Sequence, residues 1–130
     1  MKKVLLGCLL VSSFAFSEMK SNPEHVQTMR GLESAMGLIE RGFLRNNANM
    51  VKRGTNNLKH KLSNIDSFII ESKEKDFNPQ AYAQNEATAI RNAADEIAKN
   101  FSEGKNDAAR AAFDKTLSRC LACHRIIRQW

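Results

Sequence analysis

Three residues near the C-terminus, Cys120, Cys123 and His124, have the types and the spacing that attachment of a covalent cofactor requires. They form the pattern C-x-x-C-H, which is the signature of c-type haem attachment. Each thiol adds to one haem vinyl group to give a thioether, and the adjacent imidazole binds the iron from one face of the ring. We therefore expect one haem c, held through Cys120 and Cys123, with His124 as the proximal iron ligand.

A zinc site and a thiol–disulfide centre are the two alternatives for this motif. A zinc site needs about four ligands, usually including a second Cys or His pair. His25 and His60 are isolated, no second C-x-x-C occurs, and we expect both histidines to face solvent. A redox C-x-x-C opens a helix after a strand, whereas this motif lies late in a helical pattern that no strand pattern precedes. Haem attachment is the strongest of the three interpretations.

The N-terminus has the features of a secretory signal peptide. Met1-Lys2-Lys3 is positively charged, residues 4–16 are mostly apolar, and Ala15-Phe16-Ser17 places small residues where a signal peptidase reads them. We predict cleavage after Ser17, which divides the chain into a signal peptide, residues 1–17, and a mature domain, residues 18–130. The apolar stretch is too short for a transmembrane helix, so we expect no stable membrane insertion.

The third cysteine, Cys8, lies inside the predicted signal peptide. Leu5-Leu6-Gly7-Cys8 loosely resembles a lipoprotein signal, but the apolar stretch before Cys8 is too short for one. Removing the segment leaves two cysteines, both used by the haem, and no disulfide framework. Because haem attachment of this kind takes place outside the bacterial inner membrane, the motif and the signal peptide together predict a periplasmic protein of a Gram-negative bacterium.

The number and distribution of charged residues are compatible with a redox partner or a membrane surface and argue against nucleic acid. Loss of Lys2 and Lys3 lowers the net charge from +6 to +4. A mild positive charge is compatible with docking on an acidic redox partner or lying near an anionic membrane surface. No basic run with interleaved aromatic residues occurs, so we exclude nucleic acid as a partner.

Helical periodicity dominates the mature chain, and strand patterns are missing. A polar cap and Pro23 predict the start of a first helix, and Asn78-Pro79 predicts the start of a third. Asparagines at 46–49 predict a turn after the first helix, Gly104 closes the third, and Gly54 weakens the second. The residues expected to point inward from the first three helices are Met29, Leu32, Met36, Ile39, Phe43, Met50, Leu58, Leu62, Ile65, Ile69, Tyr82, Glu86, Ile90, Ala93, Ile97 and Phe101.

A fourth helix opens at Asn106-Asp107 and carries the motif. Four amphipathic helices with short connections predict an all-α fold, an antiparallel up-down-up-down four-helix bundle. Cys120 and His124 are four residues apart and so share one helical face, and that stripe also holds Ala109, Phe113, Leu117 and Ile127. We expect the haem to lie in the bundle interior beside the fourth helix, near the C-terminus, where alanines of the third and fourth helices leave room for it.

With these features the mature chain resembles the cytochrome c′ family and its low-spin relatives of the cytochrome c-556 type, the class II c-type cytochromes. The resemblance covers its length, its helix plan and the segment from Cys120 to Arg128. Arg128 matches the family's basic residue after the motif, and we expect its cation to raise the reduction potential or to complement the helix dipole. Ile127 departs from the aromatic residue usual before it. The resemblance also implies a homodimer formed through the first two helices.

The resemblance places the residue on the open side of the iron in the first helix. Met29 is our first candidate for a sixth ligand, and Met36 is the alternative; Leu32 in that position would leave the iron open. A methionine gives a low-spin His/Met iron suited to electron transfer, whereas a leucine leaves a five-coordinate iron that binds NO or CO. We predict a periplasmic electron carrier with periplasmic or membrane redox partners, with NO/CO binding as the alternative. We do not predict an enzyme.

Overall fold

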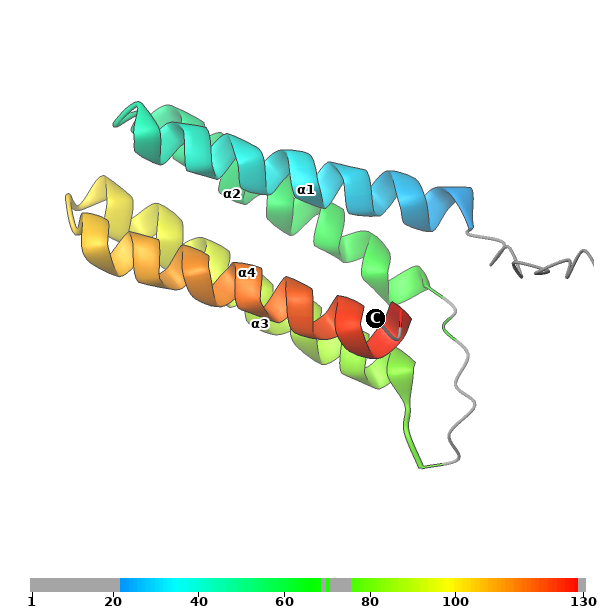
Figure 1. Cartoon of the computed structure of the whole chain (residues 1–130). Coiled ribbons are helices and arrows are strands. Elements are labelled where there is room, and N and C mark those ends of the chain that lie inside the picture. Colours follow the sequence, from blue (N-terminus) through cyan, green and yellow to red (C-terminus); the bar gives the residue numbers. More distant parts are fainter. Residues whose placement is uncertain (1–21, 69, 71–75, 129–130) are drawn as a thin grey trace, which may run out of the picture.

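The computed structural model describes residues 22–68, 70 and 76–128, and the regular elements in these residues are all helical (Figure 1). They are α1 (Pro23–Leu44), α2 (Ala48–Leu62), a 3₁₀ helix η1 (Ser63–Ser67), α3 (Pro79–Ser102) and α4 (Asn106–Arg128). Four α-helices without a strand in the described residues confirm the all-α prediction and are consistent with a helical bundle. The predicted signal peptide, residues 1–17, and Ile69 lie outside the described residues. No described helix has the length and apolar content needed to span a membrane.

Local sequence determines where the helices begin and end. Asn22, Asn47 and Asn78 are the N-caps of α1, α2 and α3, and each side-chain carbonyl accepts a hydrogen bond from a backbone N–H of the first turn. These bonds satisfy donors that a helix start otherwise leaves unpaired. Asn46 and Gly104, which follow α1 and α3, have positive φ angles of 46° and 74°. The predicted helix starts at Pro23 and Pro79 and the turn at Gly104 are confirmed. The turn predicted over residues 46–49 is shorter than expected, because Ala48 and Asn49 already belong to α2.

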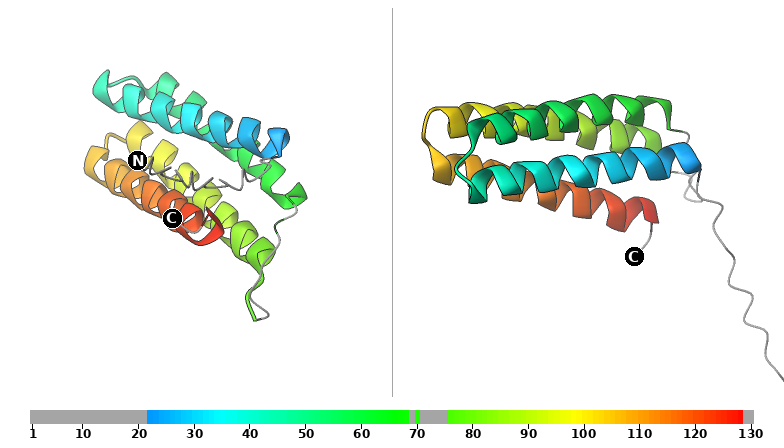
Figure 2. Two further views of the ribbon diagram at one scale, coloured as in Figure 1. Left: turned by 45° about the vertical axis from the view of Figure 1, so that its right-hand side comes forward. Right: turned by 90° about the horizontal axis from the view of Figure 1, so that it is seen from above.

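The packed helix pairs are α1 with α2, α2 with α3, and α3 with α4. The connections from α1 to α2 and from α3 to α4 lie at the same end of the molecule (Figure 1), and Figure 2 shows the two pairs from two further directions. Two buried glycines allow α1 and α2 to approach closely. A Cβ atom on Gly54 would lie 2.6 Å from Ile39 Cγ1, and one on Gly42 would lie 2.6 Å from Val51 Cγ2. The sequence predicts that Gly54 weakens its helix, and the structure adds that this glycine permits the close contact of α1 with α2.

The core is apolar and uses small residues on α3 and α4. Ile39, Leu58 and Ile97 are completely buried. Seven further residues of the predicted inward stripe are buried or partly buried against the core, which confirms the prediction for them: Met29, Leu32, Met36, Phe43, Leu62, Ile65 and Ile90. Six alanines of α3 and α4 are also buried: Ala83, Ala87, Ala93, Ala94, Ala109 and Ala112. These small side chains fit the close packing of α3 on α4.

The α1–α4 side of the molecule has fewer contacts between its helices than the sides formed by the other neighbouring pairs. Phe43 of α1 packs against Phe113 of α4, edge to face at 5.6 Å between ring centroids, and stacks on Phe101 of α3 at 5.1 Å. Beyond this aromatic cluster, the described parts of α1 and α4 share no extensive interface like those of the other neighbouring pairs. The cluster lies toward the end of the molecule with the two short connections, and the C-x-x-C-H motif lies further along α4 (Figure 1).

Candidate haem-attachment site

The first half of α4 fixes how the motif is presented, because each residue turns about 100° around the helix axis. Ala109, Ala112 and Thr116 are buried and define the inner side of the helix. The Thr116 hydroxyl meets its hydrogen-bonding need within α4 by donating to the Ala112 carbonyl at 2.9 Å. Cys120 follows one turn later on the same side and is partly buried against the core.

The three motif residues divide between the two neighbours of α4. By helical spacing, His124 falls on the same side as Phe113 and Leu117, and Phe113 contacts α1. Cys123 falls on the side of Arg119, which pairs with Glu86 of α3. Cys120 lies between them. The motif therefore spans the inner side of α4, with the imidazole toward the α1 side and one thiol toward α3.

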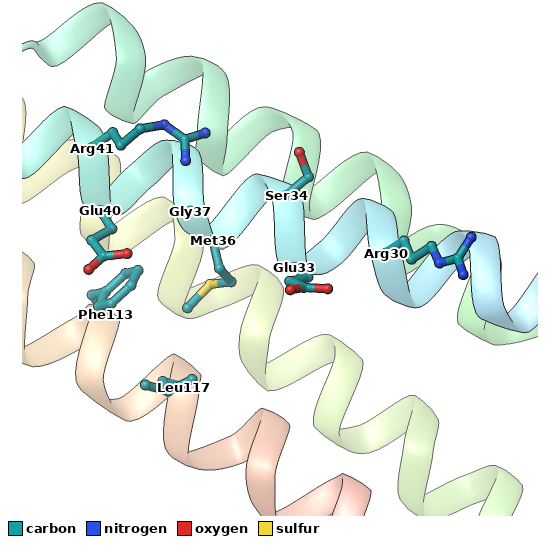
Figure 3. A pocket seen from close by; sticks show the side chains of 9 residues that line it. All are labelled: Arg30, Glu33, Ser34, Met36, Gly37, Glu40, Arg41, Phe113 and Leu117. Carbon is teal, nitrogen blue, oxygen red and sulfur yellow. The ribbon is translucent and has the colours of Figure 1, made fainter.

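A groove lies between α1 and α4, with a volume of about 590 Å³. Ligand pockets in proteins typically have volumes of ~300–1,000 Å³. Figure 3 shows Met36 extending from α1 toward Phe113, with Leu117 below them on α4. Polar residues of α1 form the rest of the lining: Arg30, Glu33, Ser34, Gly37, Glu40 and Arg41.

Two leucines on α4 have large exposed surfaces, and one of them, Leu117, lines the groove. Leu117 is 44% exposed and Leu121 is 48% exposed. The prediction that Leu117 points inward is wrong, because α4 packs on α3 through its alanine face and leaves Leu117 at the edge of the groove. An apolar group in the groove would contact this edge and remove the leucine surface from water.

The candidates for the residue opposite His124 differ in position. Met29, Leu32 and Met36 are all partly buried against the core, as their common stripe predicts. Met36 is the member of this set that lines the groove. Leu32 and Met29 lie one and two turns nearer the start of α1.

The electrostatic setting of the thiols does not suit a redox dithiol. Burial raises the pKa of the Cys120 thiol to about 11, and the nearby Cys123 and Glu86 act in the same direction. Burial, followed by Glu86, also raises the pKa of the Cys123 thiol. Reactive dithiol centres instead lower the pKa of the attacking thiol to form thiolate. This difference disfavours the thioredoxin-like alternative.

A carboxylate beside the motif was absent from the sequence-based prediction of the site. Arg119 Nη1 donates to both oxygens of Glu86, at 3.2 and 3.1 Å. The Glu86 side chain is only 17% exposed. Its position on the inward stripe of residues 79–102 was the available signal, but pairing with Arg119 depends on how α3 packs against α4.

The other histidines do not join the site. His60 is exposed, as predicted. The prediction that His25 faces solvent is wrong, because its ring is partly buried and stacks on Phe68 at 3.8 Å between centroids. Within the part of the chain that the structure describes, no three His, Cys, Asp or Glu side chains gather in a metal-binding cluster. The backbone of Arg128 ends α4, but its side chain lies outside the described parts.

The residues present fit a covalently attached haem. Two thiols and an imidazole lie partly buried on α4, and the groove reaches α4 at Phe113 and Leu117, the latter one turn before Cys120. Comparison with known proteins adds no family assignment: no family model, no curated protein and no solved structure matches this chain.

Proposed function

We propose that the mature chain is a periplasmic mono-haem c-type cytochrome that carries electrons. The observation that carries this proposal is the C-x-x-C-H motif, whose three residues are partly buried on α4; a groove that Met36 lines from α1 meets α4 at Leu117, one turn before Cys120. Cys120 and Cys123 would hold the haem by thioether bonds, and His124 would bind its iron. The bound haem supplies a reversible one-electron couple.

The proposal includes an antiparallel up-down-up-down arrangement of the helices, with α1 and α4 as neighbours. Phe43 and Phe113 pack together, which supports taking them as level. His124 is eleven residues after Phe113, and Leu32 is eleven residues before Phe43. At about 1.5 Å of rise per residue in each helix, Leu32 is then level with His124, and Met36 is level with Cys120.

The direction of the side chains favours Met36 over Met29 as the sixth ligand. Side chains on a helix lean toward its N-terminus. In the antiparallel register, His124 therefore leans toward the level of Met36, and Met36 leans back toward the level of His124. Met29 leans away from both. A His/Met iron is low-spin, and a Met ligand raises the reduction potential, both of which suit electron transfer.

A five-coordinate iron that binds NO or CO is the second candidate function, and the level of Leu32 favours it. Leu32 is partly buried, and its backbone is level with His124 in the same register. If Leu32 rather than Met36 faces the iron, its side chain offers no ligand atom and the sixth position stays open. The same fold would then capture a small gas instead of carrying electrons.

The partners follow from the secreted location and the charge. The net charge of +4 after loss of Lys2 and Lys3 supports docking on an acidic periplasmic or membrane-bound redox partner. Arg128 would contribute a cation near the haem. A homodimer formed through α1 and α2 belongs to the proposal, whereas enzymatic turnover and binding of nucleic acid do not.

Visible spectra of the purified protein test the proposal and separate the two functions. Electron transfer predicts a low-spin reduced spectrum with sharp α and β bands that CO does not change. A broad high-spin spectrum that shifts on addition of CO would instead establish the gas-binding alternative. Met36→Leu should convert the first spectrum to the second, and Met29→Leu is the matched control that should leave it unchanged.

A further inference from the structure

The ion pair between Glu86 and Arg119 is unusual among those that the described residues form. Arg119 immediately precedes Cys120, so the pair lies at the start of the motif, on the α3 side of α4. The Glu86 side chain, at 17% exposed, is the least exposed member of any of these ion pairs. Its carboxylate is anchored through both oxygens, at 3.2 and 3.1 Å from Arg119 Nη1.

Stability alone does not explain a half-buried ion pair at this position. Removing two charges from water costs free energy that their attraction only partly returns, and apolar residues of similar volume often stabilise as well or better. Ala83, Ala87 and Ile90, which lie within one turn of Glu86 on α3, are buried and apolar. The charges therefore suggest a role in the electrostatics of the site.

The negative charge of Glu86 acts on both cysteines of the motif. After burial, its negative charge is a further cause of the raised pKa of both the Cys120 and the Cys123 thiols. It also contributes to the raised pKa of Tyr82, again after burial. A charge that acts on the sulfur atoms of Cys120 and Cys123 would also act on a haem bonded to those sulfurs. Because the pair is largely withdrawn from water, salt screens this interaction less than it screens surface charges.

We propose that Glu86 and Arg119 are positioning residues that set the reduction potential of the attached haem, an inference that rests on the proposed function. Reduction adds one electron from an external donor to ferric iron and gives ferrous iron, so the site loses one positive charge. The Glu86 carboxylate favours the more positive ferric state and lowers the potential. Arg119 acts in the opposite sense and holds the carboxylate in place against α4.

The test is a potentiometric titration of the haem-loaded protein with dithionite as reductant. Glu86→Gln should raise the equilibrium constant for reduction about tenfold, which is ~59 mV for a one-electron couple. Arg119→Gln should lower the equilibrium constant by a similar factor. Glu86→Asp keeps the charge, so its equilibrium constant should stay close to that of the wild-type protein. The Glu86→Gln shift should also persist at 1 M NaCl, roughly where the Debye length falls to ~3 Å.

Glu96→Gln is the matched control, because Glu96 is an exposed carboxylate on the same helix ten residues further along. It should change the equilibrium constant less than twofold. The inference is overturned if Glu86→Gln and Glu96→Gln shift it equally, or if Glu86→Gln and Arg119→Gln shift it in the same direction. Should Glu86→Gln not load haem, Arg119→Gln still tests the sign, because it should lower the equilibrium constant for reduction.

A pyridine haemochrome assay on the same wild-type preparation keeps two failures apart. Absence of covalent haem there would refute the proposed function itself. Covalent haem with an unchanged potential in both Gln variants would refute only the role of Glu86 and Arg119. A purely structural ion pair would lower the melting temperature of both variants without the opposed shifts in potential.

Discussion

Replacing Gly54 with alanine tests the close approach of α1 and α2, on which the position of the groove wall depends. A Cβ atom at this position would lie 2.6 Å from Ile39 Cγ1, 2.9 Å from Ile39 N and 3.1 Å from the Ala35 carbonyl oxygen. Two of these three atoms belong to the backbone of α1 and cannot rotate away. The two helices would have to separate by a few tenths of an ångström or more to admit the methyl group.

The expected loss of stability is the difference between two opposed effects. Overpacking of this kind costs about 1–3 kcal/mol, and replacing glycine by alanine within a helix returns about 1 kcal/mol. We therefore expect Gly54→Ala to lower the free energy of unfolding by about 1 kcal/mol, the middle of the resulting range of about 0–2 kcal/mol. Gly37→Ala is the matched control, because its Cβ would meet only the flexible Arg41 guanidinium, at 3.2 Å. It should be neutral or stabilising, by up to ~1 kcal/mol.

Urea denaturation followed by far-ultraviolet circular dichroism measures both variants under one set of conditions. The midpoint of Gly54→Ala should fall, and its melting temperature should drop by roughly 4 °C or more. The midpoint of Gly37→Ala should stay or rise. A Gly54→Ala protein as stable as the Gly37→Ala protein would contradict the packing of α1 on α2 described above, and with it the placement of Met36 in the groove.

Three further predictions concern the site and the helix that supports it. Met36→Leu should abolish the low-spin spectrum and permit CO binding, while Met29→Leu should not; the reverse outcome would exclude the register proposed for α1 and α4. In the chain prepared without haem, alkylation of Cys120 by iodoacetamide should quicken about tenfold per pH unit up to a pKa of about 11, because only the thiolate reacts; a rate that levels off below pH 8 would contradict its burial. Asn78→Ala should destabilise the protein by ~1 kcal/mol through loss of the α3 N-cap. The same urea titration would detect this loss as a lower midpoint. An unchanged midpoint would mean that the cap does not contribute to stability.

Features that depend on neighbouring residues in the chain could be predicted from the sequence. The caps Asn22 and Asn78, and the left-handed conformation at Gly104, follow from side-chain and backbone chemistry within a few residues. The all-α architecture follows from a repeating apolar stripe. The attachment motif is likewise local, since two thiols and an imidazole need only fixed spacing on one helix.

Features that depend on how helices meet could not be predicted in this way. Gly54 was expected to weaken α2, but its missing side chain is what permits the close contact with Ile39. Leu117 was expected to point inward, yet the rotation of α4 that packs its alanine face leaves Leu117 at an exposed edge. The pairing of Glu86 with Arg119 joins residues 33 positions apart. No local pattern encodes these relations.

The measurement that tests the central claim most directly is the intact mass of the mature protein, purified from a host that attaches haem to secreted proteins. The account predicts one species heavier than the polypeptide by one haem, which acid–acetone extraction does not remove. Replacing Cys120 and Cys123 together by alanine should abolish the added mass. A wild-type protein that gains no mass and keeps two free thiols would contradict the account.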